Sequence, residues 1–191
     1  MKEWETKVCW NNVCLPKARA FSWLAGNRRI LSGDCLRKMG FVGPFRCVLC
    51  EKAEEDVDHL LLNCEFAQEA WLFGLQRLNW KGPMAGNLCD WLDSWLVSGK
   101  PSTFATVWKI LPSIVLWELW KERNRRVFEG KAENRQRFLI RLERAISELV
   151  SNAASHVNLA KVPFTQFDAS FLLSWPLVKF RPVNGHLRAN L

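Results

Sequence analysis

The 191-residue chain contains no tyrosine and only three histidines, although it carries eleven tryptophans and twelve phenylalanines. It has no run of about 20 apolar residues, the length needed to span a bilayer. The longest apolar stretch covers residues 110–120 and includes Pro112 and Glu118. The first ten residues carry charges throughout and lack the apolar core of a signal peptide. We therefore expect an intracellular protein, nuclear or cytoplasmic, that has no membrane partner.

Catalytic motifs are also missing. A reverse transcriptase needs paired aspartates to hold two metal ions, and no two of the six aspartates are adjacent. The sequence shows no strand–helix alternation of the kind that carries ribonuclease H carboxylates. A Cys–His hydrolase using His59 or His156 would lack a supporting acid and a glycine-rich nucleophile turn. We expect no enzymatic activity and no small-molecule substrate.

Cysteine usage favours metal binding over disulfides. Seven cysteines is an odd number, and without an export signal they are expected to stay reduced. Those that follow no ligand spacing are interpreted as small buried residues. These are Cys9, Cys14, Cys35 and Cys89.

The other cysteines cluster with a histidine. Cys47 and Cys50 form a C-x2-C turn, His59 follows after eight residues and Cys64 after four more. Three thiolates and one imidazole suit tetrahedral zinc, and four protein ligands leave no position for water. His59 and Cys64 would lie about 140° apart on a continuous α-helix. One ion can hold both only if the helix ends or distorts near Asn63. We expect one structural Zn²⁺; the alternative is two packing cysteines and a surface histidine.

Charge is unevenly distributed in this chain of net charge +8. Residues 51–69 carry seven acids and one lysine, whereas residues 121–144 carry nine bases and four acids. A polyanion is expected to be repelled by the first segment and attracted by the second. The alternative is a solvated helix face. The candidate contacts for RNA or DNA are Lys121, Arg123, Arg125, Arg126, Arg135, Arg137, Arg141 and Arg144.

Apolar periodicity predicts a mainly α fold, with a small helical domain organised by one CxxC…HxxxxC zinc site, a long helical hairpin and an irregular C-terminal tail. Pro112 is expected to kink the first helix of the hairpin or to begin a new one. Helices are expected at about 16–26, 36–39, 65–78, 89–99, 101–128 and 132–156. The expected domains are a zinc-binding helical module at 1–88, a helical extension with Trp-rich and basic amphipathic helices at 89–159, and an irregular basic tail at 160–191.

Three segments carry a family resemblance. In order, "LPKARAFSWLAGNRRILSGDCLRKMGF", "CVLCEKAEEDVDHLLLNCEFAQEAW" and "VLWELWKERNRRVFEGK" resemble the zinc-binding module near the C-terminus of plant LINE-type (non-LTR) retrotransposon reverse transcriptases. The resemblance covers about residues 4–131. It implies that Cys47, Cys50, His59 and Cys64 are the zinc ligands. It also implies that Trp117, Trp120, Lys121, Arg123, Asn124 and Arg126 belong to a characteristic tryptophan-and-basic helix, and that partners include nucleic acid or retroelement proteins.

Two functions remain open. One is a truncated or derived piece of a retroelement that binds nucleic acid weakly and without sequence preference, through arginines whose planar guanidinium suits phosphate. The alternative is a protein-interaction or purely structural domain without nucleic-acid binding. In that case zinc and tryptophans such as Trp108, Trp117 and Trp120 only build the fold. A degenerate reading frame without a selected function is a further possibility.

Overall fold

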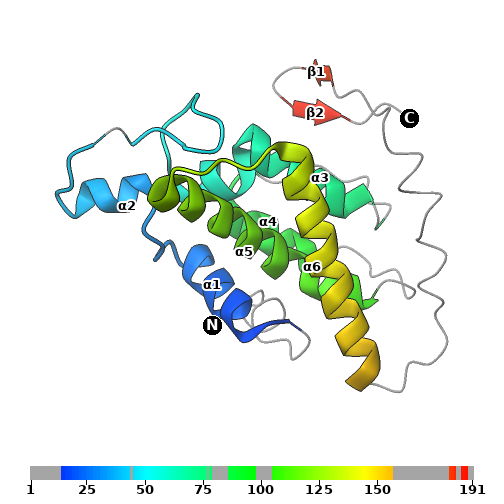
Figure 1. Ribbon diagram of the computed structural model, residues 1–191. Coiled ribbons are helices and arrows are strands. Elements are labelled where there is room, and N and C mark those ends of the chain that lie inside the picture. Colours follow the sequence, from blue (N-terminus) through cyan, green and yellow to red (C-terminus); the bar gives the residue numbers. More distant parts are fainter. Residues whose placement is uncertain are drawn as a thin grey trace. The chain divides into compact units, whose positions relative to one another are not determined.

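The computed structural model describes residues 14–43, 45–76, 78, 86–97, 105–156, 181–183 and 186–188. The chain divides into two compact units, Met1–His156 and Val157–Leu191. The helices of the first unit are α1 (Pro16–Gly26), α2 (Gly33–Lys38), α3 (Glu65–Gln76), α4 (Leu88–Val97), α5 (Ala105–Glu129) and α6 (Arg135–His156), with a π-helical turn, η2 (His59–Asn63), before α3 (Figure 1). The predicted mainly α fold is confirmed. None of the described helices is long and apolar enough to cross a membrane.

The second unit contains two short antiparallel strands. They are β1 (Arg181–Val183) and β2 (His186–Arg188), with Arg181 opposite Arg188. This pair falls in the segment predicted to be an irregular tail, most of which lies outside the described residues. In the first unit, the amide of Leu88 donates to Asp58 at 3.0 Å. Residues on both sides of the domain boundary predicted at 88 therefore belong to the same unit.

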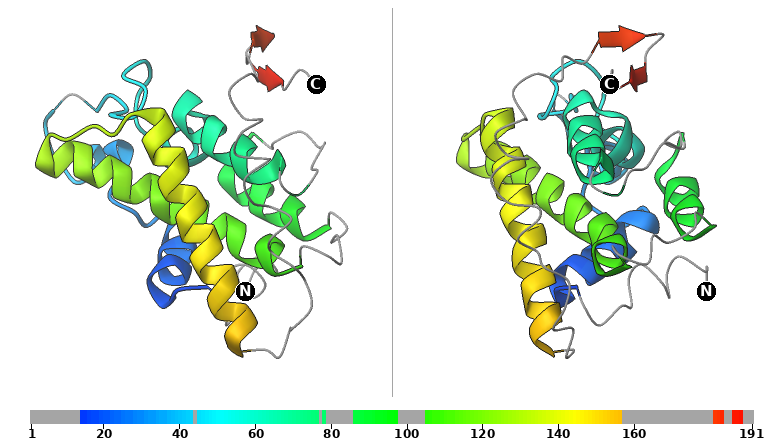
Figure 2. Two further views of the ribbon diagram at one scale, coloured as in Figure 1. Left: turned by 45° about the vertical axis from the view of Figure 1, so that its right-hand side comes forward. Right: turned by 90° about the vertical axis from the view of Figure 1, so that its right-hand side faces the viewer.

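α5 occupies the centre of the first unit and contacts α1, η2, α3 and α6. The right view of Figure 2 shows α6 and α4 on opposite sides of it. Apolar residues spaced to share one face of α5 are buried, namely Trp108, Leu111, Val115 and Leu119. The middle of α5 is buried on all sides, because six of the seven residues between 110 and 116 are apolar and the seventh, Ser113, is small.

Pro112 lies inside α5 without ending it. Proline lacks the N–H that would bond the carbonyl four residues earlier, which belongs to Trp108. The indole N–H of Trp95 on α4 donates to this carbonyl at 3.0 Å. Of the two outcomes expected at Pro112, a kink or the start of a new helix, the second does not occur, because α5 continues through it. A side chain from another helix bonds the carbonyl that proline leaves free.

Aromatic rings join the helices into one core. Trp95 and Trp108 stack at 4.4 Å between ring centroids, and Trp71 packs edge-on against Trp91 at 5.5 Å. All four are buried. On the other side of α5, Phe21 of α1 contacts Trp117 and Trp120, which are half-buried. The alternative in which Trp108, Trp117 and Trp120 build the fold is thus consistent with their packing.

Glu55 connects the loop between α2 and η2 to α5. Its carboxylate accepts hydrogen bonds from Arg123 at 2.8 Å and from the amide of Gly33 at 3.0 Å. The Arg123 and Glu55 side chains are only 6% and 3% exposed. A Cβ at position 33 would lie 2.9 Å from the Glu55 carbonyl oxygen, so glycine is needed for this approach. The pair therefore fixes three distant segments of the chain to one another.

Replacing Arg123 with methionine leaves the Glu55 carboxylate buried without its cation, and breaking such a pair costs about 3–5 kcal/mol. We expect Arg123→Met to lower the free energy of unfolding by about that amount, measured by urea denaturation. The control, Lys38→Met, removes the 78% exposed partner of Asp34. It should cost less than about 1 kcal/mol. Equal losses in the two variants would contradict this role for the buried pair.

Candidate metal centre

The four predicted ligands lie together. The ligand atoms of Cys47, Cys50, His59 and Cys64 are all within 4.8 Å of one another. The Cys47 and Cys64 sulfurs are 3.9 Å apart, and the Cys50 sulfur is 3.2 Å from His59 Nε2. Two sulfurs about 2.3 Å from a tetrahedral zinc ion would be separated by about 3.8 Å. The spacing of the cluster therefore fits one ion of that size.

The first two ligands come from a tight reversal of the backbone between residues 47 and 50. The Cys47 amide donates to the Ala53 carbonyl at 2.8 Å, and the Glu51 amide donates to the Cys47 carbonyl at 2.7 Å. Glu51 itself adopts a left-handed conformation, with φ of 59°. The amides of Cys50 and Leu49 hydrogen-bond to the Cys47 sulfur. The turn thus holds two sulfurs on one side and stabilises negative charge on the first. We call residues 47–54 the knuckle.

η2 brings His59 and Cys64 to the same side of the backbone. The Cys64 amide donates to the His59 carbonyl at 2.7 Å, which is the five-residue hydrogen bond of a π-helix. This wider turn places residue i+5 nearly above residue i, whereas an α-helix would rotate it about 140° away. Cys64 then leaves the helix in an extended conformation, with ψ of 136°. The distortion predicted near Asn63 is confirmed.

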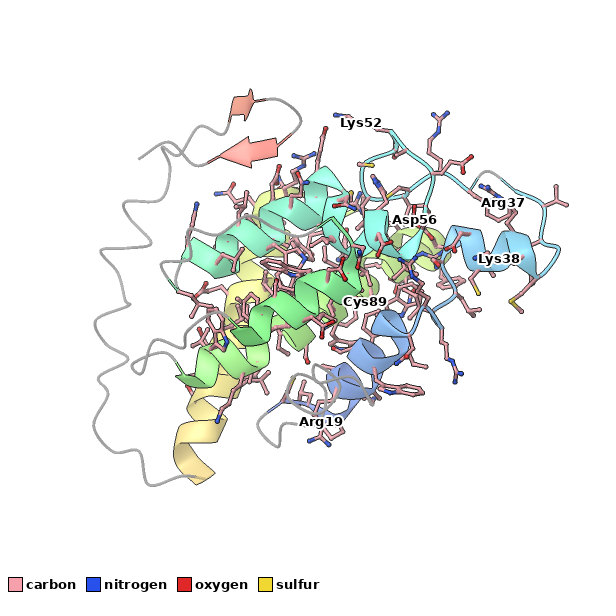
Figure 3. All side chains as sticks on the ribbon, turned by 180° about the vertical axis from the view of Figure 1, so that it is seen from behind. Arg19, Arg37, Lys38, Lys52, Asp56 and Cys89 are labelled. Carbon is pink, nitrogen blue, oxygen red and sulfur yellow. The ribbon has the colours of Figure 1, made fainter. Side chains whose placement is uncertain are left out.

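Three neighbouring groups hold η2 in place. The Asp56 carboxylate accepts the His59 amide at 2.8 Å, and the Asp56 carbonyl accepts the Leu60 amide at 2.9 Å (Figure 3). The indole N–H of Trp71 donates to the Leu61 carbonyl at 2.8 Å. Leu60, Leu61 and Leu62 are completely buried. The turn is therefore capped at its start, bonded at its middle and packed into the core.

Zinc binding to this cluster must release protons, because the pKa values of both His59 and Cys64 are raised above their usual range while that of Cys47 is lowered. The hydrogen bond with Cys64 lowers the pKa of Cys47 to about 4, and His59 and the knuckle amides act in the same direction. The hydrogen bond with Cys47 raises the pKa of His59 to about 9. Cys47 is therefore a thiolate at neutral pH, the form that binds zinc. Cys14, which lies outside the cluster, has its pKa raised to about 11 by burial and stays a thiol.

Three sulfurs and an imidazole nitrogen are a ligand set that Zn²⁺ prefers. Cys47 and Cys64 are fully buried, while Cys50 and His59 are half-buried. A zinc ion held by all four would cross-link the knuckle to η2. In small modules such a cross-link supplies about 10–16 kcal/mol of apparent binding energy. Four protein ligands leave no open position for a reacting water, so the arrangement suits a structural ion.

Arg126 of α5 holds the knuckle from outside. Its Nη1 donates to the carbonyls of Val48 and Leu49, at 3.0 and 3.1 Å. Its Nε donates to Glu122 at 2.8 Å, and its Nη2 donates to the Glu133 carbonyl at 3.2 Å. Sequence reasoning had assigned Arg126 to phosphate contact and missed this role. The only local signal for it is Glu122, one helical turn before Arg126.

Most other predicted nucleic-acid contacts are also engaged within the protein. Arg123 is buried against Glu55. Of the eight candidates, only Arg137 and Arg144 pair with no carboxylate among the described residues, and both are exposed. The remaining pairs are Lys121 with Glu118, Arg125 with Glu122 and Glu133, Arg135 with Glu69 and Glu65, and Arg141 with Glu118, Glu122 and Glu133.

The acidic segment 51–69 supplies several of these partners and pairs with other cations as well. Its ion pairs are Glu54 with Arg37, Glu55 with Arg123, Asp58 with Arg28, Glu65 with Lys52, and Glu69 with Arg135. Opposite charges that are separate in the sequence are therefore adjacent in the fold. The two charge blocks are not independent surfaces, because Arg123 and Arg135 join them directly. The other ion pairs of each block form within it or with residues outside both blocks.

Arg126→Met keeps an apolar stem at this position but removes the donors to the knuckle carbonyls. Changes to groups that support metal ligands typically alter metal affinity by about 10–100-fold. We expect this substitution to accelerate zinc transfer to a colorimetric chelator by about tenfold or more. Arg137→Met, on the exposed face of α6, is the control and should leave the rate unchanged. Identical release rates in parent and Arg126→Met protein would rule out the clamp.

No curated protein and no solved structure matches this chain. One family model does match, over residues 1–71. This region includes the knuckle, η2 and all four clustered side chains. Residues 1–71 are thus similar to the family zf-RVT, described as zinc-binding in reverse transcriptase.

Proposed function

We propose that the chain is a non-catalytic module in which one structural zinc ion fixes the knuckle and η2 against α5. The convergence of Cys47, Cys50, His59 and Cys64 within 4.8 Å carries this proposal. The match of residues 1–71 to a zinc-binding family of reverse transcriptases supports it. Hydrogen bonds from Arg126 to the knuckle extend the effect of the ion into the helices. The zinc ion, the knuckle, η2 and α5 would together form a helical scaffold.

The origin that we propose is a plant LINE-type retroelement, of which this chain is a truncated or derived piece acting in the nucleus or the cytoplasm. The order of the three resembling segments supports this origin. The chain has no adjacent aspartates of the kind that hold two metal ions in a polymerase. A role in protein interaction is compatible with the same scaffold.

Metal content tests the proposal directly. We expect one zinc ion per chain in the purified parent, and most of it to be lost from Cys50→Ser, because serine is a poor zinc ligand. Zinc binding of about 10–16 kcal/mol is comparable to the stability of a whole domain, so this variant should also lose helical signal. Elemental mass spectrometry and circular dichroism provide the two readouts. Cys35→Ser, half-buried and outside the cluster, should keep its zinc. Equal zinc in parent and Cys50→Ser would defeat the ligand assignment.

Weak nucleic-acid binding is a second candidate function. The observations that favour it are the net charge of +8 and the two exposed arginines on α6, Arg137 and Arg144. They are seven residues apart, so they share one face at a separation of about 10 Å. The six other candidate cations are held in ion pairs, which reduces the charge available to phosphates. Any such binding should therefore be weak and independent of sequence.

Fluorescence anisotropy of a labelled single-stranded oligonucleotide at several salt concentrations tests this candidate. Binding should weaken steeply as salt rises, because contacts to phosphate release counterions. The double variant Arg137→Ser/Arg144→Ser should reduce the slope of log affinity against log salt by about 1.4, or about 0.7 for each lost contact. Lys17→Ser/Arg29→Ser removes the same charge from exposed positions elsewhere and should leave the slope unchanged. Absence of binding at low salt would end this candidate.

A further inference from the structure

Exposed apolar side chains gather in two groups. Nine large hydrophobic residues are exposed in the described part of the chain, and six of them belong to these groups. The α2 tip consists of Leu31, Met39, Phe41 and Val42, which are 51%, 61%, 59% and 102% exposed. The α5 end consists of Val127 and Phe128, which are 42% and 76% exposed. Concentrated apolar exposure of this kind marks interaction sites, whereas scattered residues do not.

The α2 tip is held in a defined conformation. Gly40 follows α2 with φ of 85°, and its amide donates to the Arg37 carbonyl at 3.0 Å. The amide of Phe41 donates to the Leu36 carbonyl at 3.2 Å. Together these bonds form the glycine-containing cap that ends many helices. A surface that is already ordered loses little conformational entropy when it binds, which favours association.

The two groups lie at the same end of the first unit. Glu55 accepts hydrogen bonds from Gly33, at the start of α2, and from Arg123, which is one turn before Val127 on α5. Figure 1 shows α2 and the C-terminal end of α5 at the same end of the first unit. The α2 tip and the α5 end can therefore belong to one surface.

The charges around this surface balance. Arg37 pairs with Glu54, Lys38 with Asp34, and Lys131 with Glu129. Figure 3 shows Arg37 and Lys38 at this edge of the molecule. Because these three cations have acidic neighbours, they add little attraction for a polyanion. Two copies of the chain can approach each other at this edge without the repulsion expected from a net charge of +8.

The apolar area approaches that of one side of a protein interface. Aromatic side chains bury about 150–250 Å² each, and the leucine, methionine and valine side chains here are of comparable or smaller size. At the exposures given above, the six residues offer on the order of 700 Å². A standard protein interface buries about 800 Å² on each partner.

We propose that this edge is a two-fold interface between two copies of the chain, in which the α2 tip of each copy packs against the α5 end of the other. In a two-fold dimer, a contact from one copy to its partner is repeated in the opposite direction. The α2 tip of each copy therefore covers the α5 end of the other copy, which gives two equivalent contacts. This interface goes beyond the proposed zinc scaffold, which only positions α2 for it.

Sedimentation velocity of the zinc-loaded full chain, from about 1 to 200 µM, tests the proposal in the range where modest interfaces dissociate. We expect a reversible monomer–dimer equilibrium. Phe41→Ser and Phe128→Ser should each weaken it by about tenfold or more, as central aromatic residues of interfaces do. Ile140→Ser, at an apolar position on α6 that is 48% exposed, is the matched control and should have no effect. Zinc content should be unchanged in all three variants, since none of these residues is a ligand.

The double variant Phe41→Ser/Phe128→Ser tests the pairing itself. If the α2 tip contacts the α5 end across the axis, the two substitutions remove shared contacts, so their effects should combine less than additively. Fully additive effects would contradict this pairing. A chain that stays monomeric up to the highest concentration, assemblies that grow beyond a dimer, or a dimer insensitive to both substitutions would each overturn the proposal. If a different protein covers this edge, the chain alone will stay monomeric at every concentration.

Discussion

The hydrogen bond from the Cys64 amide to the His59 carbonyl sets the geometry on which the rest of the structure depends. It converts one helical turn to π geometry, so that an imidazole and a thiol five residues apart face the same centre. The knuckle then completes a four-ligand set, and Arg126 connects the knuckle to α5. An irregular turn is retained here because three buried leucines and the Trp71 indole hold it on the core side. The local distortion and the convergence of the four side chains are therefore two aspects of one feature.

Charged residues that are far apart along the chain form ion pairs in the fold. Acids of the segment 51–69 meet cations that lie up to about 70 residues away, and the Glu55–Arg123 pair is almost completely buried. Buried ion pairs add little net stability, because removing both charges from water offsets their attraction. Their effect is better described as positional. If the loop that carries Glu55 were placed differently against α5, both Glu55 and Arg123 would be buried without a partner of opposite charge. The pair therefore favours one placement of this loop on α5.

Local patterns could be predicted from the sequence, and long-range partners could not. The ligand spacing predicted which four side chains converge, and the five-residue gap between His59 and Cys64 required the helix distortion that the structure contains. Helix positions followed from apolar periodicity. The roles of Arg123 and Arg126 did not, because their partners lie 68–78 residues away, and an exposed arginine and a buried one look alike in sequence. The continuity of α5 through Pro112 depends on a tryptophan from another helix, which no local rule supplies.

The indole groups of Trp71 and Trp95 share one task. Each donates its N–H to a backbone carbonyl next to a helical irregularity, at η2 and at Pro112 respectively. Phenylalanine could fill the same space but has no donor, so the two aromatic residue types are not interchangeable at these positions. Because the chain has no tyrosine, its ultraviolet emission beyond that of phenylalanine comes from tryptophan. The ring of Trp71 is hydrogen-bonded to the turn that carries His59. A change in the geometry of η2 would therefore alter the surroundings of one of the eleven tryptophans that contribute to this emission.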